Sequence, residues 1–180
     1  MAHISVPKGV PGIRSLVMYR PESGQHLYSL AQVLLRGDSP LTEAERELIA
    51  AYVSSRNECM FCMSSHAAAA RYLFKEEKQV VDFVLADYAS APINDKLKAL
   101  LNIAGKVQQN GKLVTEYDVA TARNAGASDR DLHDTVLIAA TFSMFNRYVD
   151  GLESFTPTDP NAYEEMGKRL GEKGYVLPSK

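Results

Sequence analysis

Helix start and stop signals recur along this 180-residue chain from about residue 22 to residue 172. Runs that alternate apolar and polar residues and are rich in Val, Ile and Thr are almost absent, so the pattern that predicts β-strands is missing throughout. A chain of 180 residues can bury roughly 70% of its unfolded surface in one domain, without a disulfide or metal staple. We therefore expect residues 1–180 to form a single compact, multi-helix, all-α domain.

Individual helices are predicted from apolar periodicity between capping and breaking residues. The sharpest start is Thr42 with Glu45 three positions later, a capping box in which each side chain satisfies a backbone N–H of the other residue. Similar pairs stand at Thr115/Asp118 and at Ser128/Asp131. The predicted helices cover residues 23–35, 42–54, 57–74, 76–88, 94–109, 115–126, 128–152 and 163–171.

The first 21 residues contain Pro7, Gly9, Pro11, Gly12 and Pro21, which interrupt regular helix. They are predicted to form an extended arm. An arm that cannot pack on itself often lies on a neighbouring subunit, so this segment gives a weak indication of a homo-oligomer.

Charge and hydropathy exclude several classes of partner. The 20 Lys and Arg residues nearly balance the 22 Asp and Glu residues, and no basic run with interleaved aromatic residues follows the chain, so a nucleic-acid partner is not expected. No segment approaches the roughly 18 unbroken apolar residues of a membrane span, and the N-terminus lacks the pattern of an export signal. The expected location is the cytoplasm, without a membrane partner.

The ten residues NECMFCMSSH, from 57 to 66, hold both cysteines of the chain, Cys59 and Cys62, and one of its four histidines, His66. On a helix, successive residues rotate by about 100°, so the three side chains fall within an arc of about 60°. His66 lies one turn beyond Cys62, where a base can take a proton directly or through one water molecule. The spacing therefore places two thiols and an imidazole on one helix face.

The helix geometry also restricts where Cys59 can lie. Residues three apart in a regular helix hold their Cβ atoms roughly 5–6 Å apart, whereas a disulfide needs about 3.5–4.5 Å. Cys59 is therefore expected at the N-terminal edge of the helix, where Asn57 upstream is compatible with a cap. The partial positive charge of the helix N-terminus favours a thiolate there, although Glu58 would oppose it and Arg56 would offset Glu58.

Three interpretations of the cysteine pair follow. A dithiol redox couple is favoured, because thiols in a reducing compartment do not form structural staples. A zinc site would use Cys59, Cys62 and His66, but no second Cys or His pair supplies the remaining ligands, so no metal or other cofactor is expected. Inert buried thiols are the third possibility. A thioredoxin-like module is disfavoured, because the segment before the pair is an amphipathic helix instead of a strand.

The run LTEAERELIAAYVSSRNECMFCMSSH resembles the signature of the alkylhydroperoxidase D and carboxymuconolactone decarboxylase superfamily. In that signature a glutamate is followed by eleven residues and then by Cys-x-x-Cys-x-x-x-His, which corresponds here to Glu47, Cys59, Cys62 and His66. PGIRSLVMYRPESGQHLYSLAQVLLRG and SMFNRYVDGL are similar to the leader and closing helix of the peroxidase-related subgroup, so the resemblance spans roughly residues 6–155.

The resemblance implies an alkylhydroperoxidase-like helical domain that assembles as a trimer or hexamer and acts as a thiol peroxidase or disulfide reductase. By this resemblance Cys62 attacks the peroxide, Cys59 resolves the sulfenic acid to a disulfide, His66 is the base and Glu47 orients the imidazole. Residues 42–155 would form the redox core, and residues 156–180 a C-terminal tail with a short helix. Studied members carry histidine where this chain has Phe61, which puts any further proton relay in doubt.

The implied partners are a small hydroperoxide and an unidentified dithiol reductant. Two alternatives stay open. Glu47 and His66 could transfer protons on a lactone or similar acid without redox chemistry, as in the decarboxylase branch. The chain could instead be a zinc-binding regulatory module.

Overall fold

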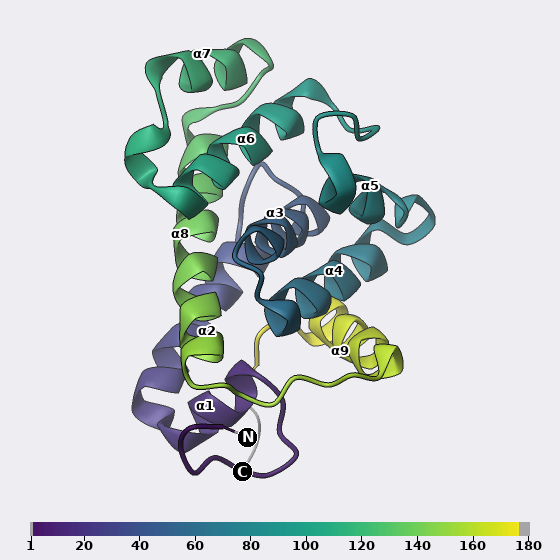
Figure 1. Ribbon diagram of the computed structural model, residues 1–180. Helices are drawn as coiled ribbons and strands as arrows, with labels where there is room; N and C mark the ends of the chain where they lie inside the picture. The colour runs from purple at the N-terminus through teal and green to yellow at the C-terminus, as the bar shows by residue number, and fades with distance from the viewer. Residues whose placement is uncertain (1, 177–180) are drawn as a thin grey trace.

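The computed structural model describes residues 2–176 of the chain. Its helices are α1 (Ile13–Tyr19), α2 (Pro21–Arg36), α3 (Glu43–Arg56), α4 (Met60–Phe74), α5 (Val80–Asp87), α6 (Asp95–Gln109), α7 (Glu116–Asn124), α8 (Asp129–Gly151) and α9 (Pro160–Lys173), with 3-10 turns η1 (Lys75–Glu77) and η2 (Gly111–Leu113). No strand occurs within residues 2–176. The predicted all-α fold is confirmed (Figure 1).

Helix α3 lies at the centre of the fold, in contact with α2, α4, α5, α6 and α8 (Figure 1). Its sequence explains this position, because residues 48–53 (LIAAYV) are apolar on every side of the helix and all are at most 7% exposed. A helix that is apolar all round must be covered all round. Ala50 and Ala51 add little bulk, so neighbouring helices can approach closely.

The predicted helix starts are confirmed where they rest on capping boxes. Oγ1 of Thr42 accepts the backbone N–H of Glu45 at 3.2 Å, and the Glu45 carboxylate accepts the backbone N–H of Thr42 at 2.8 Å. The pairs at Thr115/Asp118 and Ser128/Asp131 form the same reciprocal bonds at the starts of α7 and α8. Each box is local, so the sequence determines it directly.

The turn between α3 and α4 differs from the prediction. Helix α4 begins at Met60 with Cys59 in the N-cap position, whereas Asn57 is the C-cap of α3. The side-chain oxygen of Asn57, the atom that would cap α4, instead accepts a hydrogen bond from Nε2 of Gln108 on α6 at 2.8 Å. Glu58, with φ of 58°, makes the tight reversal between the two helices. Cys59 therefore lies at the N-terminal edge, as the disulfide geometry requires.

The N-terminal arm is less extended than predicted, because residues 13–19 form α1. The helix-breaking residues end at Gly12, and the following IRSLVMY carries Leu16 and Val17, which are at most 2% exposed. Pro21 then serves as the first residue of α2, a position that suits proline. The extended assignment for the whole of residues 1–21 is therefore wrong over α1.

The arm also lies on its own chain instead of extending from it. The backbone N–H of Gly12 donates to the carbonyl of Phe155 at 2.8 Å, and that of His3 donates to the carbonyl of Leu152 at 3.0 Å. Leu16 belongs to an apolar cluster that includes Cys59 and Cys62. The arm therefore gives no support for a contact with a neighbouring subunit; it covers the cysteine region of its own domain.

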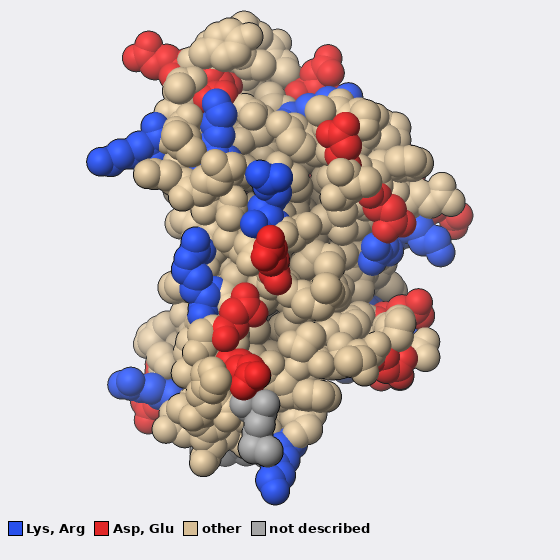
Figure 2. Space-filling view, viewed as in Figure 1, with Lys and Arg blue, Asp and Glu red and all other residues tan. Residues whose placement is uncertain are grey.

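The chain after α8 passes across the region of α1 in Figure 1 and leads to α9, which packs beside α4. Helix α9 is longer than predicted, because Asp159 caps it and Pro160 occupies its first position. None of the helices in residues 2–176 is long and apolar enough to cross a membrane. On the face seen in Figure 2, basic and acidic side chains are interspersed without a broad basic patch.

Candidate active site

The four residues of the signature come together at the contact between α3 and α4. Glu47 lies on α3, Cys59 caps α4, and Cys62 and His66 lie one turn apart on α4. All four are buried, with exposed fractions of 0% for Glu47 and Cys59, 3% for Cys62 and 7% for His66. Such burial of two thiols and an ionisable pair has to be compensated by specific partners.

The two cysteines are free thiols that belong to one buried apolar cluster. The pKa of Cys59 is raised well above its ordinary value, first by a hydrogen bond with Cys62, then by burial, and also by a hydrogen bond with Asp150. A raised pKa keeps Cys59 in the thiol form. The two sulfurs are thus close neighbours at the start of α4.

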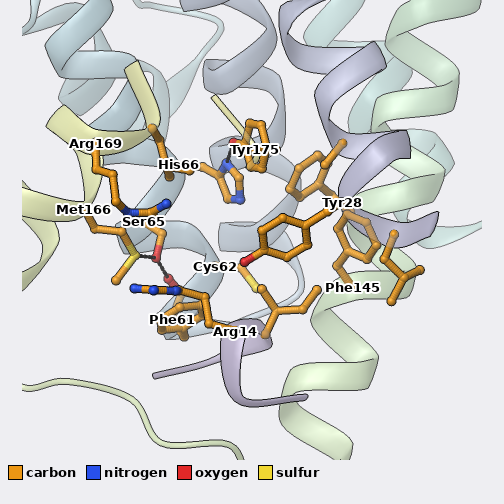
Figure 3. A pocket seen from close by; sticks show the side chains of 15 residues that line it. Arg14, Tyr28, Phe61, Cys62, Ser65, His66, Phe145, Met166, Arg169 and Tyr175 are labelled. Atoms are coloured by element: carbon orange, nitrogen blue, oxygen red, sulfur yellow. Dashed lines mark hydrogen bonds between the residues drawn. The ribbon is translucent and has the colours of Figure 1, made fainter. Parts of the chain in front are cut away.

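The two thiols differ in their access to a small cavity. It has a volume of about 50 Å³, enough for a few water molecules or one small ligand. Cys62 and His66 line this cavity, whereas Cys59 does not. The other lining residues come from α1, α2, α4, α8, α9 and the segment after α9: Ile13, Arg14, Leu27, Tyr28, Ala31, Phe61, Ser65, Phe142, Phe145, Met166, Arg169, Leu170 and Tyr175 (Figure 3).

The imidazole of His66 is held by Glu47. Nδ1 of His66 lies 2.7 Å from Oε2 of Glu47, a distance typical of a charge-assisted hydrogen bond. A carboxylate cannot donate, so Nδ1 carries the proton and the other nitrogen, Nε2, has a free lone pair when the ring is neutral. Figure 3 shows that second nitrogen directed into the cavity. The arrangement presents a base to the space beside Cys62.

Glu47 accepts two further hydrogen bonds on its other oxygen. Nη2 of Arg36 donates to Oε1 at 2.6 Å, and the hydroxyl of Tyr175 donates to the same oxygen at 2.8 Å. Burial alone would raise the pKa of Glu47, but His66, Arg36 and Tyr175 outweigh it and hold that pKa below its ordinary value. Glu47 is therefore a buried carboxylate that stays ionised.

Aromatic rings fix the plane of the imidazole. Phe142 of α8 meets the His66 ring edge-on, with 4.5 Å between ring centroids. Tyr175 lies nearly parallel to the same ring, at 6.1 Å and 12°. Burial and then the neighbouring Glu47 raise the pKa of Tyr175 well above its ordinary value, so its hydroxyl remains a donor. The His66 ring is therefore positioned by two aromatic rings and by the hydrogen bond at Nδ1.

Phe61, which replaces the histidine of studied relatives, packs as an apolar wall. It is 4% exposed, and its ring lies 6.3 Å from that of Tyr163. A Cβ at Gly12 would come within 1.9 Å of the Phe61 ring, so the arm passes directly against it. This position supplies packing and offers no group that could carry a proton.

Two residues of the site were not identified from the sequence, Arg36 and Tyr175. Arg36 ends α2 and by pattern alone is a charge that complements the helix dipole. Tyr175 follows the last helix and carries no local signal at all. The cavity lining also extends beyond the predicted core of residues 42–155, since α1, α2 and α9 contribute to it.

The described residues do not contain a group of three or more His, Cys, Asp or Glu side chains arranged to hold a metal ion. Among the described residues, Cys59, Cys62 and His66 are thus not grouped as the three ligands that the zinc interpretation uses.

Comparisons with known proteins agree with the signature. The sequence profile of the carboxymuconolactone decarboxylase family matches residues 21–104, which include Glu47, Cys59, Cys62 and His66. A search of curated proteins finds no match. The matched segment runs from the start of α2 to near the end of α6, and it contains the α3–α4 pair that carries the signature.

Solved structures extend the similarity over most of the chain. A peroxidase-related protein from Ralstonia eutropha, described as an alkylhydroperoxidase AhpD core, has 28% identity and a TM-score of 0.78, covering 88% of this chain and 82% of its own. A peroxidase-related protein from Silicibacter has 28% identity and a TM-score of 0.77, covering 86% and 79%. A protein from Agrobacterium tumefaciens, at 19% identity and a TM-score of 0.65 over 80% and 97%, supports the fold alone. The signature, the fold and the family match over residues 21–104 together support the alkylhydroperoxidase D and carboxymuconolactone decarboxylase superfamily for this chain.

Proposed function

We propose that this protein is a thiol-dependent hydroperoxidase, with Cys62 as the attacking residue and Cys59 as the resolving residue. The superfamily supports a general peroxidase-related or decarboxylase-like role. One observation favours the peroxidase role: Cys62 lines a cavity into which the second nitrogen of His66 points, and Cys59 lies in the same buried cluster as Cys62 but outside the cavity lining.

The first step consumes the peroxide. The Cys62 thiolate attacks one oxygen of a hydroperoxide ROOH, forming an S–O bond while the O–O bond breaks. The leaving alkoxide takes a proton, and the products are the Cys62 sulfenic acid and the alcohol ROH. His66 would accept the thiol proton beforehand and return it to the leaving oxygen, because Nε2 faces the cavity in which the peroxide has to lie.

The second step forms the disulfide. The Cys59 sulfur attacks the sulfur of the Cys62 sulfenic acid, the S–O bond breaks, and water leaves with the proton of the Cys59 thiol. Since Cys59 occupies the N-cap of α4, its backbone is outside the regular helix and can adjust to disulfide geometry. An external dithiol would then reduce the disulfide and return both thiols.

Glu47 is a positioning residue in this scheme. Its carboxylate holds the Nδ1 proton of His66 and stabilises the imidazolium that forms when Nε2 takes a proton. Arg36 and Tyr175 keep that carboxylate ionised inside the protein. The base is thus kept in one tautomer and one orientation through the cycle.

The test uses one equivalent of hydrogen peroxide and reduced protein, followed by peptide mapping without reductant. The expected product is a Cys59–Cys62 disulfide within one peptide. Replacement of Cys62 by Ser should abolish peroxide consumption, whereas replacement of Cys59 by Ser should leave a sulfenic acid on Cys62 that a dimedone probe traps. If Cys62→Ser consumes peroxide at the wild-type rate, the proposal fails.

A second candidate is proton-transfer chemistry without redox, favoured by the buried Glu47–His66 pair. It predicts lactone or decarboxylation activity that survives in the double variant Cys59→Ser/Cys62→Ser and is lost in His66→Gln. The peroxidase proposal predicts the reverse for the cysteine variants, so the same proteins separate the two functions.

A further inference from the structure

Two arginines line the cavity beside Cys62, Arg14 from α1 and Arg169 from α9. Figure 3 shows both guanidinium groups on the same side of the cavity. Both side chains are only partly exposed. The mechanism proposed above uses neither of them.

Neither arginine has an anionic partner among residues 2–176. No carboxylate in that part of the chain lies within ion-pair distance of Arg14 or Arg169, and neither guanidinium forms a hydrogen bond there. By contrast, two other buried arginines have acceptors. Arg36 donates to the Glu47 carboxylate and to two backbone carbonyls, and Nη1 of Arg46 donates to two backbone carbonyls. Two half-buried cations side by side without an anion are unfavourable in the empty protein.

The groups that face this arginine pair carry no negative charge. Burial and then the charge of Arg14 lower the pKa of Arg169, while two phenols, Tyr28 and Tyr175, act in the opposite direction. Burial raises the pKa of both phenols, so they are neutral at physiological pH. The positive charge of the pair is therefore available to a ligand in the cavity.

We infer that Arg14 and Arg169 form an oxyanion subsite, and that the substrate reaching Cys62 is a small peroxide bearing a carboxylate. Arginine suits this role because its planar donors match the two oxygens of a carboxylate. The cavity volume of about 50 Å³ limits the ligand to a few heavy atoms beyond that group. The peroxide identity rests on the proposed function, whereas the oxyanion subsite does not.

The test uses two alkylating agents that attack the same sulfur. Iodoacetate and iodoacetamide are nearly equal in size and both lose iodide to a thiolate, but only iodoacetate is an anion. The rate of each at Cys62 is measured by mass spectrometry of the peptide that contains both cysteines. The ratio of the two rates cancels any change in thiolate fraction, since both reagents draw on the same thiolate.

The expected result is a ratio of iodoacetate to iodoacetamide rates that falls at least about tenfold in Arg14→Gln/Arg169→Gln, because two charge-assisted contacts are lost. The matched control is Arg20→Gln/Arg147→Gln, which removes two positive charges from exposed arginines outside this cavity. The control should keep the wild-type ratio, which separates a local subsite from the effect of net charge.

An equal ratio in the wild type and Arg14→Gln/Arg169→Gln overturns the subsite. Should neither reagent reach Cys62, calorimetric titration with propionate decides instead, and absence of saturable binding to the wild type overturns it as well. Alkylation and propionate binding need no peroxide chemistry. A changed ratio without disulfide formation by peroxide would therefore leave the subsite standing and refute the proposed function alone.

Discussion

Nδ1 of His66 lies 2.7 Å from Oε2 of Glu47, and this contact joins two helices that are neighbours in sequence and in space. The contact fixes the orientation of the His66 imidazole. The carboxylate is fully buried and has donors on both oxygens. Changes at Glu47 should therefore affect the chemistry of His66 more than the shape of the cavity, which Glu47 does not line.

Glu47→Gln should slow disulfide formation by peroxide by about tenfold or more. A neutral amide stabilises the imidazolium less than a carboxylate does, and it no longer selects the Nδ1–H tautomer of His66. The check is the rate of disulfide formation as a function of pH, and the rising limb of the profile should shift. Glu76→Gln, at an exposed position, is the matched control and should behave as the wild type. A wild-type pH profile for Glu47→Gln would contradict the positioning role.

The same carboxylate should contribute to acid stability. Burial raises the pKa of Glu47, but His66, Arg36 and Tyr175 together lower it by more than burial raises it. The folded pKa therefore lies below the unfolded value of about 4.3. The stability from this ionised group is present above pH 4.3 or so and is lost as pH falls through the folded pKa. Denaturant unfolding of wild type and Glu47→Gln from pH 7 to pH 3 should show free energies of unfolding that converge on acidification. A constant difference would contradict the shift.

Tyr175→Phe should lower the free energy of unfolding while leaving the aromatic ring in place. The variant keeps the ring that stacks on His66 but loses the hydroxyl that donates to Glu47. A hydrogen bond to a charged group contributes about 1.5–3 kcal/mol, so the free energy of unfolding should fall by about that amount. Tyr117→Phe is the control, since Tyr117 is 80% exposed and should be neutral. Equal stability of the two variants would place the Tyr175 hydroxyl outside the network.

Gly12→Ala should destabilise the fold by about 1–3 kcal/mol. Gly12 has φ of 54°, and an added Cβ would lie 1.9 Å from the Phe61 ring beside Cys62. Thermal unfolding checks this against Gly151→Ala, where a Cβ meets nothing within 4 Å. If the arm were free of the domain, both alanine variants would melt together. Peroxide reactivity should fall only in Gly12→Ala, because Phe61 is part of the cavity wall.

The cysteine roles can be separated by overoxidation. Cys62 lines the cavity and Cys59 does not, so excess peroxide should convert Cys62 to sulfinic acid in Cys59→Ser, where no thiol resolves the sulfenic acid. In the wild type the disulfide should form first and limit this product. Mass spectrometry after treatment with about a tenfold excess of peroxide distinguishes the wild type from Cys59→Ser. Preferential overoxidation of Cys59 in the wild type would indicate that Cys59 is the attacking residue and Cys62 the resolving one.

Several features of the protein could be predicted because they are local. The capping box at Thr42 and Glu45 depends on residues three apart, and the shared face of Cys62 and His66 depends on residues four apart. The position of Cys59 at the helix edge followed from the reach of a disulfide. Glu47 was different: its part in the site came from the family resemblance, since nothing local distinguishes it from other helix carboxylates.

The sequence by itself determined the helical class and the grouping of two thiols with one imidazole, because those features repeat with the period of a helix. Only the tertiary structure decided the partners of Glu47 and the walls of the cavity. Tyr175 meets Glu47 across 128 residues of sequence, and Arg36 meets it from the end of another helix. Such contacts arise when separate elements pack, and no pattern within one segment encodes how its neighbours will be placed.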